Sequence, residues 1–236
     1  SARIKRCDGE GMRQASLRLY IPDPCRGAEG KLVTLTRRDL STSPTQRYVL
    51  VDIGIRGAMN GFSLSDYLKL VERAKALPHV EEVAAVVPDV FNDFVATVRN
   101  YKKYAPRMRD VKLVFVAQQL VPPPGDLEPP PDIVAVPTHR QGNVLCSRNP
   151  RLCAERTSRF LQIVANNRVH FLGPPKRLLR LLLPLLGDGR VYSADTMAYR
   201  LAPAQSAKLR RKEGDKGLYM ADKGVACKWF ELWARL

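Results

Sequence analysis

Hydrophobic residues along this chain fall into short apolar runs, which alternate with longer segments whose apolar positions have helical spacing. Short runs that are apolar throughout predict β-strands buried on both faces. The runs that we interpret as strands are residues 17–21, 32–35, 48–53, 83–87, 112–117, 133–136, 168–172 and 191–193. The first two of these are the weakest candidates.

Helices are expected between several of these strands. Each expected helix begins at a residue that typically caps a helix or at a proline, which costs no hydrogen bond in the first turn. The expected starting points are Ser63, Asn92 or Asp93, Asn149-Pro150 and Pro174-Pro175. Apolar residues at helical spacing follow each of them.

Buried strands that alternate with helices indicate a parallel sheet covered by helices. We therefore expect an α/β fold, a (β/α)8 TIM-like barrel over residues 1–203. An open, doubly wound sheet is the alternative. Residues 204–236 are expected to form a basic C-terminal extension, whose aromatic helix docks on the barrel.

Polar residues stand at the ends of the predicted strands. Asp52, Asp89 and Asp195 lie at or just after three strand ends, and Gln118 and Gly173 follow two others. Because the carboxyl ends of parallel strands meet at one edge, these residues are expected to converge on one mouth. Three carboxylates and an amide there predict a site that binds a heterocycle and performs acid–base or nucleophilic chemistry.

The net charge bears on the choice of partner. The 236 residues include 39 Lys and Arg against 23 Asp and Glu, a formal net charge of +16. A charge of this size favours polyanions, of which nucleic acid is the commonest, although a solvated basic surface with no specific partner is the alternative. The candidate nucleic-acid contacts, taken from basic clusters, are Arg99, Lys102, Lys103, Arg210 and Arg211.

The remaining composition argues against membranes and metals. No apolar run reaches the roughly 18–20 residues that span a bilayer, and the first residues do not read as a secretory signal, so we expect a cytoplasmic protein. The five cysteines lack zinc-site spacing, so neither a metal nor a cofactor is expected. Cys146 and Cys153 are close enough in sequence to form a disulfide, with free buried thiols as the alternative.

Several strand ends form an ordered series of motifs. The series reads V-D-x-G at 51–54, P-D at 88–89 before a helix containing Thr97, a strand ending in Gln118, H-F-L-G-P at 170–174 and S-A-D-T at 193–196. Over residues 48–199 it resembles the tRNA-guanine transglycosylase superfamily, most closely its short DNA-directed branch. The resemblance implies a (β/α)8 barrel that exchanges guanine for a 7-deazaguanine base through a covalent glycosyl-enzyme intermediate.

The resemblance also implies which carboxylates are catalytic. Asp195 resembles the nucleophile that attacks the anomeric carbon, where a carboxylate suits an oxocarbenium-like transition state. Asp52 resembles the acid–base group that handles the proton of the departing or incoming base. We expect His170, which precedes the glycine of its motif, to pack in the core rather than to act in catalysis.

Base recognition is implied in the same way. Asp89 and Gln118 resemble the side chains that hydrogen-bond the edge of the base, and Gly173 resembles the glycine that lets backbone amides approach the purine carbonyl. The tRNA enzymes usually read D-S-G-G-F-Q where this chain reads D-I-G-I. The aromatic ring that stacks on the base is therefore expected to be Phe62 or Phe91.

The substrate follows from what the chain lacks relative to those enzymes. Their zinc subdomain has several cysteines after the nucleophile strand, whereas only Cys227 follows it here. DNA is therefore favoured over tRNA as the nucleic-acid substrate that receives the 7-deazaguanine base. The alternative, from a different functional class, is a non-catalytic basic barrel that binds nucleic acid or serves as a partner subunit of a catalytic protein. A base or nucleoside hydrolase, in which water takes the second step, is a third possibility.

Overall fold

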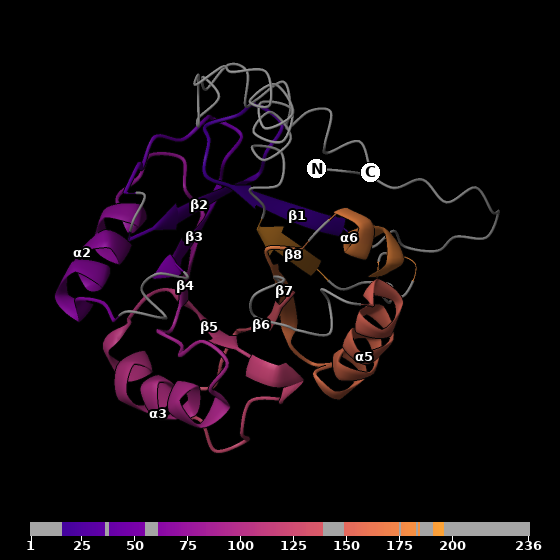
Figure 1. The fold of residues 1–236 in the computed structure, drawn as a ribbon. Helices are drawn as coiled ribbons and strands as arrows, with labels where there is room; N and C mark the ends of the chain where they lie inside the picture. Colours follow the sequence, from indigo (N-terminus) through magenta and orange to yellow (C-terminus); the bar gives the residue numbers. More distant parts are fainter. Residues whose placement is uncertain are drawn as a thin grey trace, which may run out of the picture.

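The computed structural model describes residues 16–35, 38–54, 61–138, 149–174, 176–182, 184 and 191–195. Eight parallel strands form a closed barrel in which neighbours in sequence are neighbours in space (Figure 1). The strands are β1 (Ser16–Ile21), β2 (Gly30–Thr34), β3 (Tyr48–Asp52), β4 (Glu82–Val86), β5 (Lys112–Val116), β6 (Ile133–Pro137), β7 (Arg168–Leu172) and β8 (Val191–Asp195). The predicted α/β class and the closed barrel are confirmed, and the alternative of an open sheet is wrong.

Helices cover the outside of the barrel. In the described part of the chain these are α2 (Leu64–Lys75), α3 (Phe94–Tyr104), α5 (Pro150–Ile163) and α6 (Lys176–Leu182), with the 3-10 helices η1 (Ala105–Arg107) and η2 (Gln118–Leu120). α2 and α3 lie on one side of the barrel, and α5 and α6 lie on the other (Figure 1). None of the described helices has the length and apolar character to cross a bilayer. The predicted C-terminal extension, residues 204–236, lies outside the described residues.

Side-chain caps explain where three of these helices begin. The capping residues are Ser63, Asp93 and Asn149, whose side-chain oxygens accept the backbone N–H groups of Asp66, Ala96 and Leu152 at 3.2, 2.8 and 3.1 Å. Such caps satisfy N–H groups that have no partner inside the helix. Two helices therefore begin as predicted, and Asp93 rather than Asn92 caps the other.

The strands are buried on both faces because their side chains alternate between two apolar layers. One set packs against the helices, as Val49 and Val51 do in the cluster that includes Tyr67 of α2. The other set fills the barrel interior and consists of Tyr20, Leu32, Leu50, Ala84, Val86, Val114, Val116, Ile133 and Ala135. Asp52 has the same parity as Leu50, so it projects toward the carboxyl end of the interior.

The interior is tightly filled where β1 meets β2. A Cβ atom on Gly30 would lie 2.6 Å from Cδ1 of the Tyr20 ring, so no larger residue fits there without a shift. The Tyr20 ring packs edge-on against His170 of β7, with 5.7 Å between the ring centroids. The glycine therefore makes room for a ring that reaches β7, which lies two strands away from β1 in the closed barrel.

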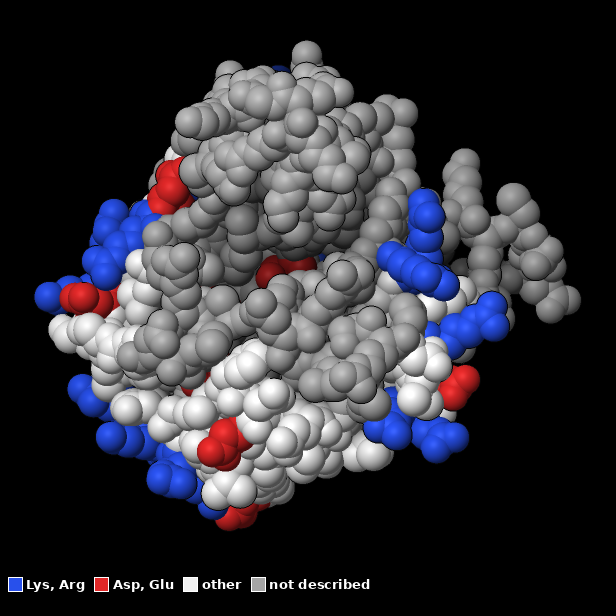
Figure 2. All heavy atoms as spheres, in the orientation of Figure 1, with Lys and Arg blue, Asp and Glu red and all other residues white. Residues whose placement is uncertain are grey.

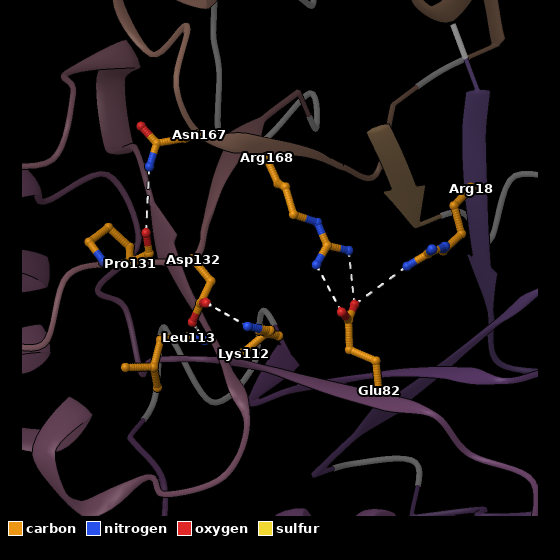
Figure 3. Close-up of polar contacts among 8 residues, drawn as sticks. All are labelled: Arg18, Glu82, Lys112, Leu113, Pro131, Asp132, Asn167 and Arg168. Atoms are coloured by element: carbon orange, nitrogen blue, oxygen red, sulfur yellow. Dashed lines mark hydrogen bonds and ion pairs between the residues drawn. The ribbon is translucent and has the colours of Figure 1, made fainter. Parts of the chain in front are cut away.

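A network of charged side chains lies at the amino ends of the strands (Figure 3). Glu82 of β4 accepts two hydrogen bonds from the guanidinium of Arg168, both at 2.9 Å, and one from Arg18 at 3.4 Å. The Arg18 guanidinium also lies 3.3 Å from the centroid of the Tyr48 ring. Partial burial acts to raise the pKa of Glu82, but the two arginines outweigh it and hold this pKa below its usual range.

Cys25 and Cys153 are both disulfide-bonded. Both are also almost fully buried, with 1% of each residue exposed. The alternative of a free thiol is therefore wrong for Cys153. Cys146, its predicted partner, lies outside the described residues.

Candidate active site at the carboxyl ends of the strands

The predicted site residues lie at one end of the barrel. Asp52 and Asp195 are the last residues of β3 and β8, and Asp89, Gln118 and Gly173 follow β4, β5 and β7. Because all eight strands are parallel and the barrel is closed, these five positions surround the same mouth. In the orientation of Figure 1, acidic atoms are visible in a recess near the centre of the molecule (Figure 2).

Asp195 is held by one of its two carboxylate oxygens. The backbone N–H of Gly173 donates to Oδ1 at 2.8 Å, and Nε2 of His170 lies 3.1 Å from the same atom. Among the described residues no donor reaches Oδ2. A carboxylate oriented in this way, with its side chain 16% exposed, presents one oxygen to a reacting group.

His170 is buried, as expected, but it also contacts the site. Its Nδ1 lies 2.9 Å from Oγ of Ser193, while its Nε2 faces Asp195. With a proton on Nε2 the ring donates to the carboxylate, and Nδ1 then accepts the Ser193 hydroxyl. Strand pairing brings these groups together, because His170 and Ser193 are partners in the register of β7 and β8.

The other two carboxyl groups have raised pKa values. Burial, reinforced by the negative charge of Asp195, raises the pKa of Asp52 to about 6, although hydrogen bonds from the amides of Gly54 and Ile53 partly oppose this. Burial and the charge of Asp52 raise the pKa of Asp89 to about 7. Each of these groups therefore titrates near neutral pH, where it can hold or release a proton.

Tyr67 connects the strand ends that carry these two acids. Its hydroxyl lies 3.0 Å from the carbonyl oxygen of Val51 and 2.6 Å from that of Val86. Burial and the nearby charges of Asp52 and Asp89 raise the pKa of Tyr67, so the phenol stays protonated and donates. Helix α2 is thereby tied to β3 and β4 at the mouth.

Gln118 positions Asp89. Its Nε2 donates to Oδ2 of Asp89 at 2.7 Å, and its Oε1 accepts the backbone N–H of Asn92 at 3.1 Å. The side chain is almost fully buried, with 2% of the residue exposed. Both ends of the amide are therefore engaged, and its expected contact with the edge of a base stays a prediction.

Asp89→Asn should stabilise the protein, and more strongly at high pH. A carboxyl group with a raised pKa in the folded state contributes stability below the unfolded value, near 4, and that stability is lost as pH rises through about 7. Asparagine cannot ionise, and its oxygen can still accept from Gln118. Urea unfolding should show a gain over the parent that is larger at pH 8 than at pH 5 by about 2–3 kcal/mol.

The matched control for this measurement is Asp126→Asn. Asp126 is exposed and its pKa is lowered by its hydrogen bond to Lys102. Its substitution should therefore give no gain that grows with pH. A gain from Asp89→Asn that is the same at pH 5 and pH 8 would contradict the raised pKa.

Phe62 and Gly173 are also predicted to contact the base, and each has contacts within the protein. The Phe62 ring packs edge-on against Tyr67 and Tyr104, with centroid distances of 6.3 and 5.9 Å, in a partly buried aromatic cluster. Gly173 has a φ of +56°, a conformation that favours glycine, and its N–H is bound to Asp195. The stacking role of Phe62 and the base contact of Gly173 stay predictions.

The predicted basic contacts lie apart from Asp195. Arg99, Lys102 and Lys103 are exposed on α3, which follows β4, and β4 is opposite β8 in the closed order of strands. Lys102 is paired with Asp126 at 2.7 Å, and the Lys103 ammonium lies 5.1 Å from the centroid of the Tyr104 ring. The other two candidates, Arg210 and Arg211, lie outside the described residues.

No set of three or more His, Cys, Asp or Glu side chains is arranged to hold a metal ion in the parts of the chain that the structure describes. The chain matches no protein-family model and no curated protein.

Proposed function

We propose that this chain is a base-exchanging glycosyltransferase of the tRNA-guanine transglycosylase type, with DNA favoured over tRNA as its substrate. The observation that carries the proposal is the gathering of Asp52, Asp89 and Asp195 at one mouth, where the pKa values of Asp52 and Asp89 are raised to about 6 and about 7. One carboxylate is oriented for attack, and two others titrate near neutral pH. The reaction needs this division between a nucleophile and proton-handling groups.

In the first step, Oδ2 of Asp195 attacks the anomeric carbon of a guanine nucleotide. A bond forms between this oxygen and the carbon while the bond from the carbon to the guanine nitrogen breaks. Asp52, whose pKa is about 6, gives its proton to the departing base as the electron pair moves onto that base. The product is an aspartyl-glycosyl ester, with the nucleic acid attached to the enzyme.

In the second step, an incoming 7-deazaguanine base reverses these events. Its ring nitrogen loses a proton to Asp52 and attacks the anomeric carbon. The ester bond breaks, and its electron pair returns to Asp195 as a carboxylate. Asp52 has then regained the proton that it gave up in the first step, Asp195 is again a free carboxylate, and no cofactor is consumed.

Asp89 is suited to recognising the base edge. Gln118 holds its Oδ2 at 2.7 Å, so Oδ1 is the oxygen available to accept from N–H groups of a guanine-like ring. A pKa of about 7 lets this carboxyl group bind the base as a charged acceptor or as a protonated donor.

We interpret the closed parallel barrel as a variant of the (β/α)8 fold, with a basic extension over residues 204–236. The connection between β1 and β2, residues 22–29, contains no helix. The variant therefore departs from full strand–helix alternation in its first unit.

The test is a base-exchange assay on the full-length protein. Guanine-containing duplex DNA and, separately, tRNA are incubated with radiolabelled guanine or a 7-deazaguanine, and incorporation into polymer is measured. Incorporation, together with a denaturation-stable adduct mapped to Asp195, is expected. Release of free guanine without incorporation would identify a hydrolase instead. If guanine is neither incorporated nor released, the alternative of a non-catalytic binding protein is the one that remains.

His170→Leu should lower kcat about 10–100-fold with little change in KM for nucleic acid. The histidine does not touch the reacting atoms but fixes Asp195, and a hydrogen bond to a charged group contributes about 1.5–3 kcal/mol. Steady-state exchange kinetics measure both constants.

His170→Gln is the matched variant, because its amide nitrogen can donate toward Asp195 from a similar position. It should recover most of the lost kcat. If the two variants were equally impaired, or if KM rose while kcat stayed constant, His170 would have no positioning role. Thermal unfolding of both variants separates a folding defect from a kinetic one.

A further inference from the structure

Helices α5 and α6 carry a surface that is rich in arginine, since five of their eight described exposed positions are arginines. We call this surface the arginine face, and it consists of Arg151, Arg156 and Arg159 of α5 and Arg177 and Arg180 of α6. All five residues are exposed. The two helices pack against each other, and in Figure 2 blue side chains gather on the side of the molecule where Figure 1 places them.

The buried sides of the two helices explain why the arginines face outward. In α5, Cys153 and Phe160 are buried, and in α6, Leu178, Leu179 and Leu182 are buried. The positions between them point away from the barrel and hold the arginines. Arg151 and Arg159 are separated by eight residues, which corresponds to about 12 Å along the helix.

The arginine face has almost no acidic counterpart. Glu155 is the acidic residue among the described exposed positions of these helices. Within the described structure none of the five arginines forms an ion pair. A group of guanidinium ions that no carboxylate neutralises is suited to binding a polyanion.

The arginine face begins beside the mouth. Gly173, whose N–H binds Asp195 at 2.8 Å, is followed after a few residues by Arg177 in the first turn of α6. α5 and α6 follow β6 and β7, so both helices lie on the side of the barrel that carries His170 and Asp195. The basic residues of α3 lie on the other side.

We infer that the arginine face is the docking surface for the sugar–phosphate backbone of duplex DNA, an inference that rests on the proposed function. A guanidinium group can donate two parallel hydrogen bonds to two oxygens of one phosphate. The described exposed positions of α5 and α6 hold no aromatic residue that could stack on an unpaired base. The surface therefore reads backbone charge rather than base identity. A duplex lying on it extends toward Asp195 at the rim.

The test compares two triple variants of the full chain that remove the same charge. The first is Arg151→Gln with Arg159→Gln and Arg177→Gln, on the arginine face. The matched control on α3 is Arg99→Gln with Lys102→Gln and Lys103→Gln. All six side chains are exposed, so both proteins should fold, which thermal unfolding checks.

Binding of a short fluorescein-labelled DNA duplex is measured by anisotropy over a range of salt concentrations. The arginine-face variant should bind at least about tenfold more weakly, and the slope of log K against log salt should fall by about 2–3. The α3 variant should lose less than about one unit of slope. The same strand without its complement should be affected less than duplex DNA, and an RNA duplex is measured beside them.

Equal losses from the two triple variants would overturn the inference, because they would show an effect of net charge alone. An unchanged slope in the arginine-face variant would overturn it as well, as would a larger effect on RNA or single strands. The outcome is separable from the proposed function. Normal exchange with unaltered binding refutes only the docking surface, whereas weakened binding without exchange by the parent refutes only the chemistry.

Discussion

Asp195→Asn should lower the rate of base exchange at least about a thousandfold and leave the affinity for duplex DNA unchanged. The asparagine oxygen can still accept from Gly173 and His170, which now bind Oδ1 at 2.8 and 3.1 Å. What the variant lacks is the anionic oxygen that would form the ester. Transition-state stabilisation is therefore removed while the shape of the site is kept.

Three measurements check this result. Initial rates give the loss of exchange, anisotropy gives the affinity, and mass spectrometry of protein denatured during turnover shows whether the adduct is lost. Asp126→Asn, a substitution of the same type at an exposed carboxylate, should behave as the parent. Turnover that survives Asp195→Asn would reject this residue as nucleophile, and a parallel fall in affinity would point to a role in binding instead.

Glu82→Ala should lower the free energy of unfolding by about 3 kcal/mol. Glu82 is the shared acceptor of Arg168 at 2.9 Å and Arg18 at 3.4 Å, with side-chain exposures of 22%, 33% and 14% for the three residues. Without it, two partly buried guanidinium groups are left facing each other with no negative charge between them. Breaking such a pair costs more than the pair contributes, because the remaining charge is desolvated and unpaired.

The neighbouring Glu81 provides a matched control for the urea unfolding experiment. It forms an ion pair with Arg47, but their side chains are 42% and 57% exposed. Glu81→Ala should therefore cost less than about 1 kcal/mol. Similar losses from both variants would mean that the network at the amino ends contributes no more than an ordinary surface pair.

Most strands were predictable because strands buried on two faces are largely apolar, as β4 (EVAAV) and β6 (IVAVP) are, whereas Arg18 in β1 and Lys31 in β2 weaken that signal. The run predicted at 168–172 is β7 as observed, and the others differ at their ends by one to two residues. The largest differences are at β2 and β8. In β8, Ala194 and Asp195 extend the strand beyond 191–193, because the polar Ser193 and Asp195 on either side of Ala194 interrupt the apolar pattern.

The contacts of His170 were not predicted, although the strand register contains the information. A histidine on an apolar strand indicates only burial, which the structure confirms at 1% exposure. Its contact with Asp195 follows once β7 and β8 are known to be neighbours and His170 is known to pair with Ser193. The two residues are 25 positions apart, so the sequence pattern alone does not indicate that they are in contact.

The arginine face was not predicted, for a similar reason. Sequence density favoured the cluster that contains Lys102, but its partner Asp126 is 24 residues away and lies beside it in the structure. The arginines of α5 and α6 are spaced along two helices, so they form no dense run. Only the packing of the two helices makes them one surface.

The absence of a side chain at Gly30 has a consequence for how this barrel can diversify. The Tyr20 ring occupies the space that a methyl group would need, and the same ring packs against His170 at 5.7 Å. Enlarging residue 30 would push the ring toward the imidazole that steadies Asp195. A larger residue at position 30 thus requires compensating replacements around Tyr20 if the orientation of Asp195 is to be kept.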